Sequence, residues 1–219
     1  MNNYGINIWS DDNFVIEDGL AKINHDCKPS LISIVKDIRK QDFKGPLLLR
    51  FPHITEKQIN TLYNTFNASI KEYDYKGNFN AVFPLKVNQL PNFIHPLINE
   101  GKKFNYGLEA GSKAELVIAM TYNNINSPIT VNGFKDKEMI HLGFIAKSMG
   151  HDITLIIEGL NELEMIIEVL NETKMEAPSI GLRVRLHSGG SGLWAKSGGI
   201  NSKFGLTSTE ILEAYELME

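Results

Sequence analysis

The segment Phe79-Asn80-Ala81-Val82-Phe83-Pro84-Leu85-Lys86-Val87-Asn88-Gln89 gives the first indication of the fold, because a short run of strand-forming residues leads through a lysine into a polar turn and a helix. Its apolar residues Phe83, Leu85 and Val87 are expected to face a core or a barrel wall. The ammonium group of Lys86 must then be paired, solvated through a cleft, or deprotonated to do chemistry. Lys86 is therefore the candidate reactive group, and a lysine that extends into solvent from a strand end is the alternative.

Strands and amphipathic helices alternate from this segment onward and predict an α/β fold. The expected strands are Ala81–Lys86, Phe104–Gly107, Ile129–Val131, Ile153–Ile157 and Ile180–Leu186. The expected helices are Pro91–Glu100, one opened by Ser112 and Glu115, Asp136–Met149, one over Leu163 to Leu170, and one opened by Thr207 and Glu210. This alternation is typical of parallel strands covered by helices, in either an open doubly wound sheet or a (β/α)8 barrel.

The region before residue 79 is less regular. Its expected elements are two short strands between Tyr4 and Ile23, a helix over Pro29–Lys40, and a buried strand over Pro46–Phe51 that ends at Pro52. Thr55 and Gln58 are spaced as a capping box for a further helix, whose apolar residues are Ile59, Leu62, Tyr63 and Phe66. The strand over Pro46–Phe51 and the five strands given above make about six for the barrel, and a full barrel usually needs about 250 residues, so we expect a truncated one.

The composition is that of an ordinary globular protein. The 219 residues carry a formal net charge of −4, with a pI near 5.9, so nucleic acid and anionic membranes are not expected partners. The single cysteine, Cys27, excludes an internal disulfide framework and fits a reducing compartment. The sequence has no apolar run long enough to cross a membrane and no signal pattern at its start, so we expect a cytoplasmic protein.

Polar side chains are expected at the carboxyl ends of the strands, where chemistry gathers in both architectures. The candidates are Lys86, Asn88, Gln89, Glu109, Gly111, Ser112, Asn132, Lys135, Glu158, Arg183, Arg185 and His187. One interpretation is a nucleophilic lysine beside a carboxylate; the other is the general polarity of strand ends. Arg183 and Arg185 share one face of a strand, and would bind an anion or form structural ion pairs.

Two further motifs carry less information. The glycine-rich run from Ser188 to Gly199 matches neither the dinucleotide-binding nor the P-loop pattern, so we interpret it as a lid or a mobile surface loop. The six histidines are scattered singly, which argues against a zinc site.

Several segments resemble the biosynthetic, pyridoxal-phosphate-dependent arginine decarboxylases. Pro84-Leu85-Lys86-Val87-Asn88-Gln89 has the form of the segment that carries the cofactor lysine in that family. The other similar segments follow in the same order as in the family: Tyr4-Gly5-Ile6 with Trp9, Pro46-Leu47-Leu48-Leu49-Arg50-Phe51, Gly107-Leu108-Glu109-Ala110-Gly111-Ser112-Lys113-Ala114-Glu115-Leu116, Gly181-Leu182-Arg183-Val184-Arg185-Leu186 and Ser202-Lys203-Phe204-Gly205-Leu206. The resemblance therefore covers essentially the whole chain.

This resemblance implies a fold and a site. It implies an alanine-racemase-like (β/α)8 barrel, of which residues 29–219 are the first part, while residues 1–28 give strands to a separate β-domain. It also implies that Lys86 binds pyridoxal 5′-phosphate covalently, and that Glu109 and Arg183 lie beside the cofactor. A requirement for Mg²⁺ is compatible with the resemblance and rests on it alone.

The implied reaction is the decarboxylation of L-arginine to agmatine and CO2, which feeds polyamine and spermidine synthesis. The resemblance further implies that residues beyond 219 complete the site, so that this chain is an N-terminal portion, inactive alone, of an enzyme that forms homo-oligomers. Two alternatives remain open at this point: a decarboxylase of another basic amino acid, and a non-catalytic binding module built on half a barrel.

Overall fold

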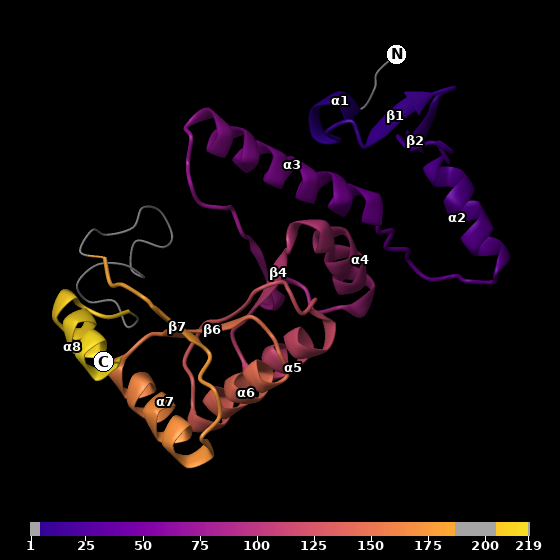
Figure 1. Cartoon of the computed structure of the whole chain (residues 1–219). Helices are drawn as coiled ribbons and strands as arrows, with labels where there is room; N and C mark the ends of the chain where they lie inside the picture. The colour runs from indigo at the N-terminus through magenta and orange to yellow at the C-terminus, as the bar shows by residue number, and fades with distance from the viewer. Residues whose placement is uncertain (1–4, 187–204, 219) are drawn as a thin grey trace. The chain divides into compact units, whose positions relative to one another are not determined.

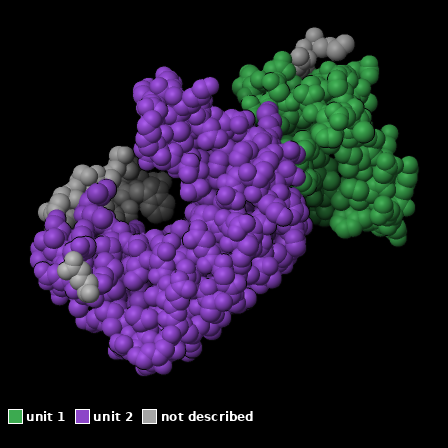
Figure 2. All heavy atoms as spheres, viewed as in Figure 1, with its two compact units in different colours: residues 1–54 green, residues 55–219 purple. Residues whose placement is uncertain are grey.

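The computed structural model describes residues 5–186 and 205–218. The chain divides into two compact units, residues 1–54 and residues 55–219, which are coloured separately in Figure 2. In the described ranges, we find no helix with the length and apolar character that a membrane crossing requires.

The first unit contains a helical turn, a hairpin and a helix. These elements are α1 (Ile6–Trp9), β1 (Phe14–Glu17), β2 (Leu20–Ile23) and α2 (Leu31–Lys40). The strands β1 and β2 are antiparallel and are joined by Asp18 and Gly19, which both have positive φ angles, as a tight hairpin turn requires. The two short strands expected between Tyr4 and Ile23 are confirmed as β1 and β2. The apolar residues Ile6, Ile8 and Trp9 before them belong to α1 instead, where the N–H of Ser10 donates to the carbonyl of Ile6 at 2.9 Å.

The other two expectations for this unit fare differently. The helix over Pro29–Lys40 is confirmed as α2, with Ser30 as N-cap, and the apolar residues Leu31, Ile34, Val35 and Ile38 are its half-buried positions. The buried strand over Pro46–Phe51 is wrong, because no described strand pairs with this segment and Leu48 is 75% exposed. A continuous apolar run such as Leu47-Leu48-Leu49 forms a strand only where a neighbouring strand completes its hydrogen bonds.

The second unit is built on one parallel sheet. Its strands are β3 (Val82–Pro84), β4 (Gly107–Ala110), β5 (Ile129–Val131), β6 (Ile153–Ile157) and β7 (Ser179–Leu182). They are hydrogen-bonded in the order β3-β4-β5-β6-β7, so each new strand adds beside the previous one. A doubly wound sheet reverses its strand order at a switch point, whereas a barrel does not. The sheet is therefore a sector of a barrel.

Helices connect these strands along one side of the sheet. The connecting helices are α4 (Pro91–Gly101), α5 (Lys113–Tyr122), α6 (Lys137–Ser148) and α7 (Leu160–Thr173), with short 3-10 turns η1 (Leu85–Val87) and η2 (Lys102–Phe104). The helix α3 (Pro52–Glu72) precedes β3, and α8 (Ser208–Met218) follows β7. From α4 to α8 each helix contacts the next, and Figure 1 shows α5, α6 and α7 side by side below the strands. One helical layer around consecutive parallel strands is the arrangement of a partial (β/α) barrel.

The core lies between the strands and this helical layer. In β6, for example, Ile153, Leu155 and Ile157 are buried toward the helices, whereas Thr154 and Ile156 between them are only half-buried on the other face. This alternation follows from the two-residue period of a strand. The helix-facing side supplies most of the hydrophobic stabilisation, and the other side carries the polar residues of the barrel interior.

Some element boundaries differ from those expected. The helix α3 begins at Pro52, where a proline is favourable because its missing N–H needs no partner, so the capping box expected at Thr55 is wrong. The box of Thr207 and Glu210 is confirmed in both directions, and the Thr207 N–H lowers the pKa of the Glu210 carboxyl. The strand expected over Ala81–Lys86 ends at Pro84, and Lys86 lies in η1.

Candidate active site

Lys86 follows β3 at the carboxyl end of the sheet. Its turn, η1, contacts β4 and α5, and Leu85 before it is fully buried. Lys86 itself is exposed, and so is Val87, so the expectation that Val87 faces the core is wrong. Among the described residues, no side chain or carbonyl forms an ion pair or hydrogen bond with the Lys86 ammonium group. The amine is anchored through a buried neighbour and is accessible to a bound molecule.

A buried carboxylate ties the Lys86 segment to the next strand end. Gln89 donates from Nε2 to Oε1 of Glu115 at 3.0 Å, and the N–H of Gly111 donates to Oε2 of Glu115 at 2.7 Å. Glu115 also donates its N–H to the Oγ of Ser112, which is one half of the predicted capping box. The loop after β4 and the segment after Lys86 are therefore held by the same side chain.

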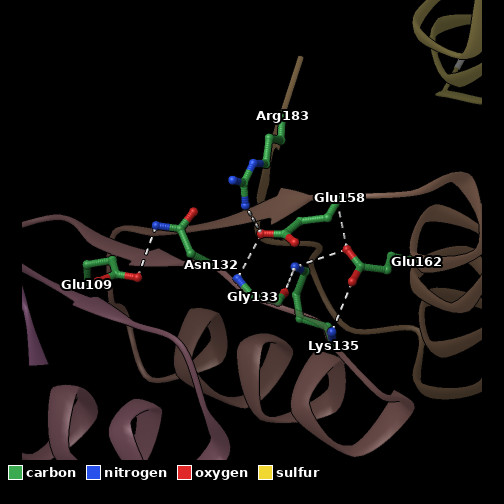
Figure 3. Close-up of polar contacts among 7 residues, drawn as sticks. All are labelled: Glu109, Asn132, Gly133, Lys135, Glu158, Glu162 and Arg183. Atoms are coloured by element: carbon green, nitrogen blue, oxygen red, sulfur yellow. Dashed lines mark hydrogen bonds and ion pairs between the residues drawn. The ribbon is translucent and has the colours of Figure 1, made fainter. Parts of the chain in front are cut away.

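Glu109 lies on β4 beside the last residue of β3, with which it is paired in the sheet. Its side chain is buried, and its Oε1 accepts a hydrogen bond at 3.1 Å from Nδ2 of Asn132, which follows β5 (Figure 3). Two of the predicted residues are thus brought together at neighbouring strand ends. The amide of Asn132 orients the Glu109 carboxylate through one oxygen. The second oxygen can then accept a hydrogen bond from a ligand.

Glu158 and Arg183 form the next pair along the sheet. NH1 of Arg183, after β7, lies 2.8 Å from Oε1 of Glu158, after β6, and the N–H of Gly133 donates to the same oxygen at 3.0 Å (Figure 3). Glu158 is buried, and its Oε2 has no hydrogen-bond partner within the described ranges. The Arg183 side chain remains 46% exposed, so its guanidinium group is both oriented by protein and accessible.

A second ion pair lies beneath this one. Nζ of Lys135 is 3.0 Å from Oε2 of Glu162, and both side chains are almost wholly buried. The sequence predicts Lys135 as a strand-end residue facing a site, but the structure places it below the surface. Lys135 is therefore not positioned to meet a substrate directly.

The remaining candidates are placed as follows. Arg185 donates from Nε to the carbonyl of Gly205 at 3.1 Å, so the two arginines differ: one binds a carboxylate and the other binds backbone. His187 and the run from Ser188 to Gly199 lie outside the described residues. The described ranges hold no group of three or more His, Cys, Asp or Glu residues suited to a metal ion.

Sequence reasoning misses three members of this arrangement: Gly133, Glu115 and Glu162. Gly133 acts through its backbone N–H, which no residue pattern reveals. The pattern around Glu115 indicates a helix cap and nothing more. Glu162 lies in the first turn of α7, and that position is the one available signal, because a carboxylate there can accept the backbone N–H groups at the start of the helix.

The fold and the site together define a class. Residues 57–219 match the family of pyridoxal-dependent decarboxylases, in its pyridoxal-binding domain, and the chain belongs to this family. The cofactor of the class is pyridoxal phosphate.

Two individual relatives within this family are biosynthetic arginine decarboxylases. The chain is similar to the crystal structure of the biosynthetic arginine decarboxylase of Campylobacter jejuni, with 57% identity and a TM-score of 0.90 over 100% of this chain and 35% of that one. It is 39% identical to the biosynthetic arginine decarboxylase of Bacteroides thetaiotaomicron, over 99% of this chain and 35% of that protein. The chain thus spans about a third of the length of these decarboxylases.

More distant structures share only the fold. A diaminopimelate decarboxylase from M. jannaschii has 23% identity and a TM-score of 0.66, over 94% of this chain and 44% of that one. The alanine-racemase-like partial barrel expected from the sequence is confirmed by these likenesses and by the strand order.

The described residues fit the cofactor of the family. An aldehyde needs an accessible amine, and Lys86 offers one that no described residue engages. The oxygens of an anionic cofactor need oriented donors, and the guanidinium of Arg183 and the amide of Asn132 lie along the same carboxyl edge.

Proposed function

We propose that this chain is the pyridoxal-binding part of an arginine decarboxylase, which converts L-arginine into agmatine and CO2 for polyamine synthesis. The observation that carries the proposal is the match to the Campylobacter jejuni arginine decarboxylase at 57% identity along the whole chain. The accessible amine of Lys86 at the carboxyl edge of the sheet supports it independently.

In this proposal Lys86 binds pyridoxal phosphate covalently through its side-chain nitrogen, and its buried neighbour Leu85 keeps the attachment point still. When bound, the cofactor supplies an electron sink for the electrons that the departing carboxylate leaves behind. Lys86 is also the side chain placed to exchange a proton with the substrate, because a released amine stays at the same position.

Glu109 and Arg183 hold the cofactor in orientation. The hydrogen bond from Asn132 orients the carboxylate of Glu109. Because Glu109 is buried, its carboxylate stabilises cationic groups of the bound molecule. Glu158 and Gly133 fix the guanidinium of Arg183, which donates to acceptor oxygens at the same edge.

The wider setting follows from the same proposal. The partner is the small molecule L-arginine, without nucleic acid or membrane, and the longer enzyme works as a homo-oligomer in the cytoplasm. Residues 1–28 contribute to a β-domain of that enzyme, and residues 29–219 to its barrel. A role for Mg²⁺ rests on family resemblance alone, since the described residues offer no ligand cluster for it.

The test is to express the whole reading frame that contains this sequence and to incubate the protein with pyridoxal phosphate and L-arginine. We expect agmatine as the product, and turnover of L-ornithine, L-lysine and diaminopimelate at least about 100-fold lower, because a site built for guanidinium leaves polar groups unpaired with other substrates. Faster turnover of another amino acid would replace arginine as the substrate. No turnover of any of them would favour a non-catalytic binding module.

The 219-residue chain is tested beside it, with the same substrate and cofactor. We expect no agmatine from it, since it covers about a third of the relatives' length. Robust turnover by this chain alone would refute that part of the proposal.

A further inference from the structure

The ion pair of Lys135 and Glu162 is unusual because it is buried, with side-chain exposures of 0% and 1%. A buried pair loses the hydration of both charges, and packed apolar residues of the same size would often be as stable. The pair of Lys137 and Glu172, which also joins the start of α6 to α7, is 45% and 60% exposed at 2.6 Å. Stability alone therefore does not explain why Lys135 and Glu162 are buried as an ion pair, which points to a further role of this pair.

Glu162 connects two strand ends through its two carboxylate oxygens. Its Oε1 accepts the N–H of Lys135 at 2.9 Å, and its Oε2 accepts the N–H of Glu158 at 2.9 Å as well as Nζ of Lys135 at 3.0 Å (Figure 3). Nζ of Lys135 also donates to the carbonyl of Gly133 at 2.6 Å. The pair thus holds the backbone after β5 and the backbone after β6 in one fixed relation.

The two backbone positions held in this way are the ones that orient Arg183. The N–H of Gly133 and NH1 of Arg183 meet on the same oxygen of Glu158, at 3.0 Å and 2.8 Å. A shift of Gly133 or of the Glu158 backbone would turn the carboxylate, and the guanidinium would follow it. The contacts of Lys135 and Glu162 are with each other, with Gly133 and with the backbone of Glu158, so they act on Arg183 through Glu158.

We propose that Lys135 and Glu162 are positioning residues, which set the direction of Arg183 toward the bound pyridoxal phosphate. This inference rests on the proposed function, because it assigns Arg183 to the cofactor. It predicts that loss of the pair changes the environment of the cofactor even where the fold survives.

The experiment uses the full-length protein and pyridoxal phosphate as the probe. The variants are Glu162→Gln, Glu158→Gln and their combination, with Glu172→Gln as the matched control on the exposed pair. We measure the dissociation constant of the cofactor by absorbance titration, and the pH midpoint of its visible absorbance band. We expect both Glu162→Gln and Glu158→Gln to weaken cofactor binding on the order of 10-fold and to move the midpoint, the lower end of the loss seen when residues that orient metal ligands are removed.

The double variant distinguishes a positioning role of Glu162 from a general effect on stability. We expect the double variant to lose no more cofactor affinity than Glu158→Gln alone, because both substitutions break the same chain of contacts. The control Glu172→Gln should leave both readouts unchanged. If Glu162→Gln does not fold, Lys135→Arg keeps the buried charge but displaces Gly133, and it should move the midpoint in the same direction.

Two failures are distinguishable. Unchanged affinity and an unchanged midpoint in folded Glu162→Gln or Lys135→Arg, with normal cofactor binding by the unsubstituted protein, would overturn this inference alone. Fully additive losses in the double variant would also overturn it. Failure of the unsubstituted protein to bind pyridoxal phosphate would overturn the proposed function, and the inference with it.

Discussion

Single residues at the carboxyl edge of the sheet are held by neighbours from the next strand. Glu109 is held by Asn132, and Arg183 is held by Glu158. Such contacts follow from the topology, because consecutive parallel strands end at the same edge of the sheet and their last residues are neighbours. The exception is Lys86, which no described residue binds, and this difference separates the candidate reactive group from its supports.

His151 provides a prediction at this scale. Burial lowers the pKa of this imidazole below its ordinary value of 6.5, so folding favours its neutral form. The unfolded chain therefore takes up a proton at a higher pH than the folded protein does. Stability is full above about pH 6.5 and is lost as the pH falls from there through the lower folded pKa, by at most about 1.4 kcal/mol per pH unit from this group.

The measurement is the free energy of unfolding in urea between pH 7 and pH 5, for the original protein and for His151→Gln. We expect the original protein to lose more stability over this range than the variant. Parallel curves for the two proteins would show that His151 does not contribute in this way.

Individual strands are defined by close backbone contacts as well as by apolar side chains. Gly107 begins β4, and a Cβ atom added there would lie 1.9 Å from the carbonyl oxygen of Pro128. That oxygen also accepts the N–H of Leu108 at 3.1 Å. Any side chain at Gly107 must therefore push β4 away from the segment that enters β5.

We expect Gly107→Ala to lower the free energy of unfolding by about 1–3 kcal/mol, the usual range for overpacking a tight site. Gly143→Ala on α6 is the control, because its added Cβ would meet the end of the flexible Leu155 side chain at 2.9 Å. Urea unfolding of both variants gives the comparison. A smaller loss for Gly107→Ala than for Gly143→Ala would contradict the account.

The sequence predicts elements well where one signal dominates. The strands β5 and β6 have the expected bounds, because each is an apolar, β-branched run between polar turns. The strand expected over Phe104–Gly107 is displaced to Gly107–Ala110, because Phe104 stacks on the ring of Tyr63 at 4.4 Å instead of pairing in the sheet. Pattern alone does not distinguish these two uses of an aromatic residue.

The candidate site shows the same limit. The rule that function gathers at strand ends selects five residues that the structure places along the carboxyl edge: Lys86, Glu109, Asn132, Glu158 and Arg183. It includes Lys135 among them wrongly, because only burial reveals that this side chain points inward. It misses Gly133 and Glu162, whose contribution is made through hydrogen bonds of backbone groups.

The molecule as a whole is a sector of a barrel with an N-terminal unit. Its parallel sheet has five strands in the described residues, against eight in a closed barrel. The arginine decarboxylases to which the chain is similar are about three times as long, and the Campylobacter jejuni one shares its fold along the matched third. In our proposal the remaining strands and the rest of the cofactor site belong to the longer enzyme.

The attachment of the cofactor to Lys86 is the central claim, and one measurement tests it directly. The full-length protein is incubated with pyridoxal phosphate, reduced with borohydride and digested, and the labelled peptide is identified by mass spectrometry. We expect the label on Lys86, no label in Lys86→Ala, and an unchanged label in Lys36→Ala, an exposed control. A label on another lysine, or equal labelling of Lys86→Ala, would contradict the account.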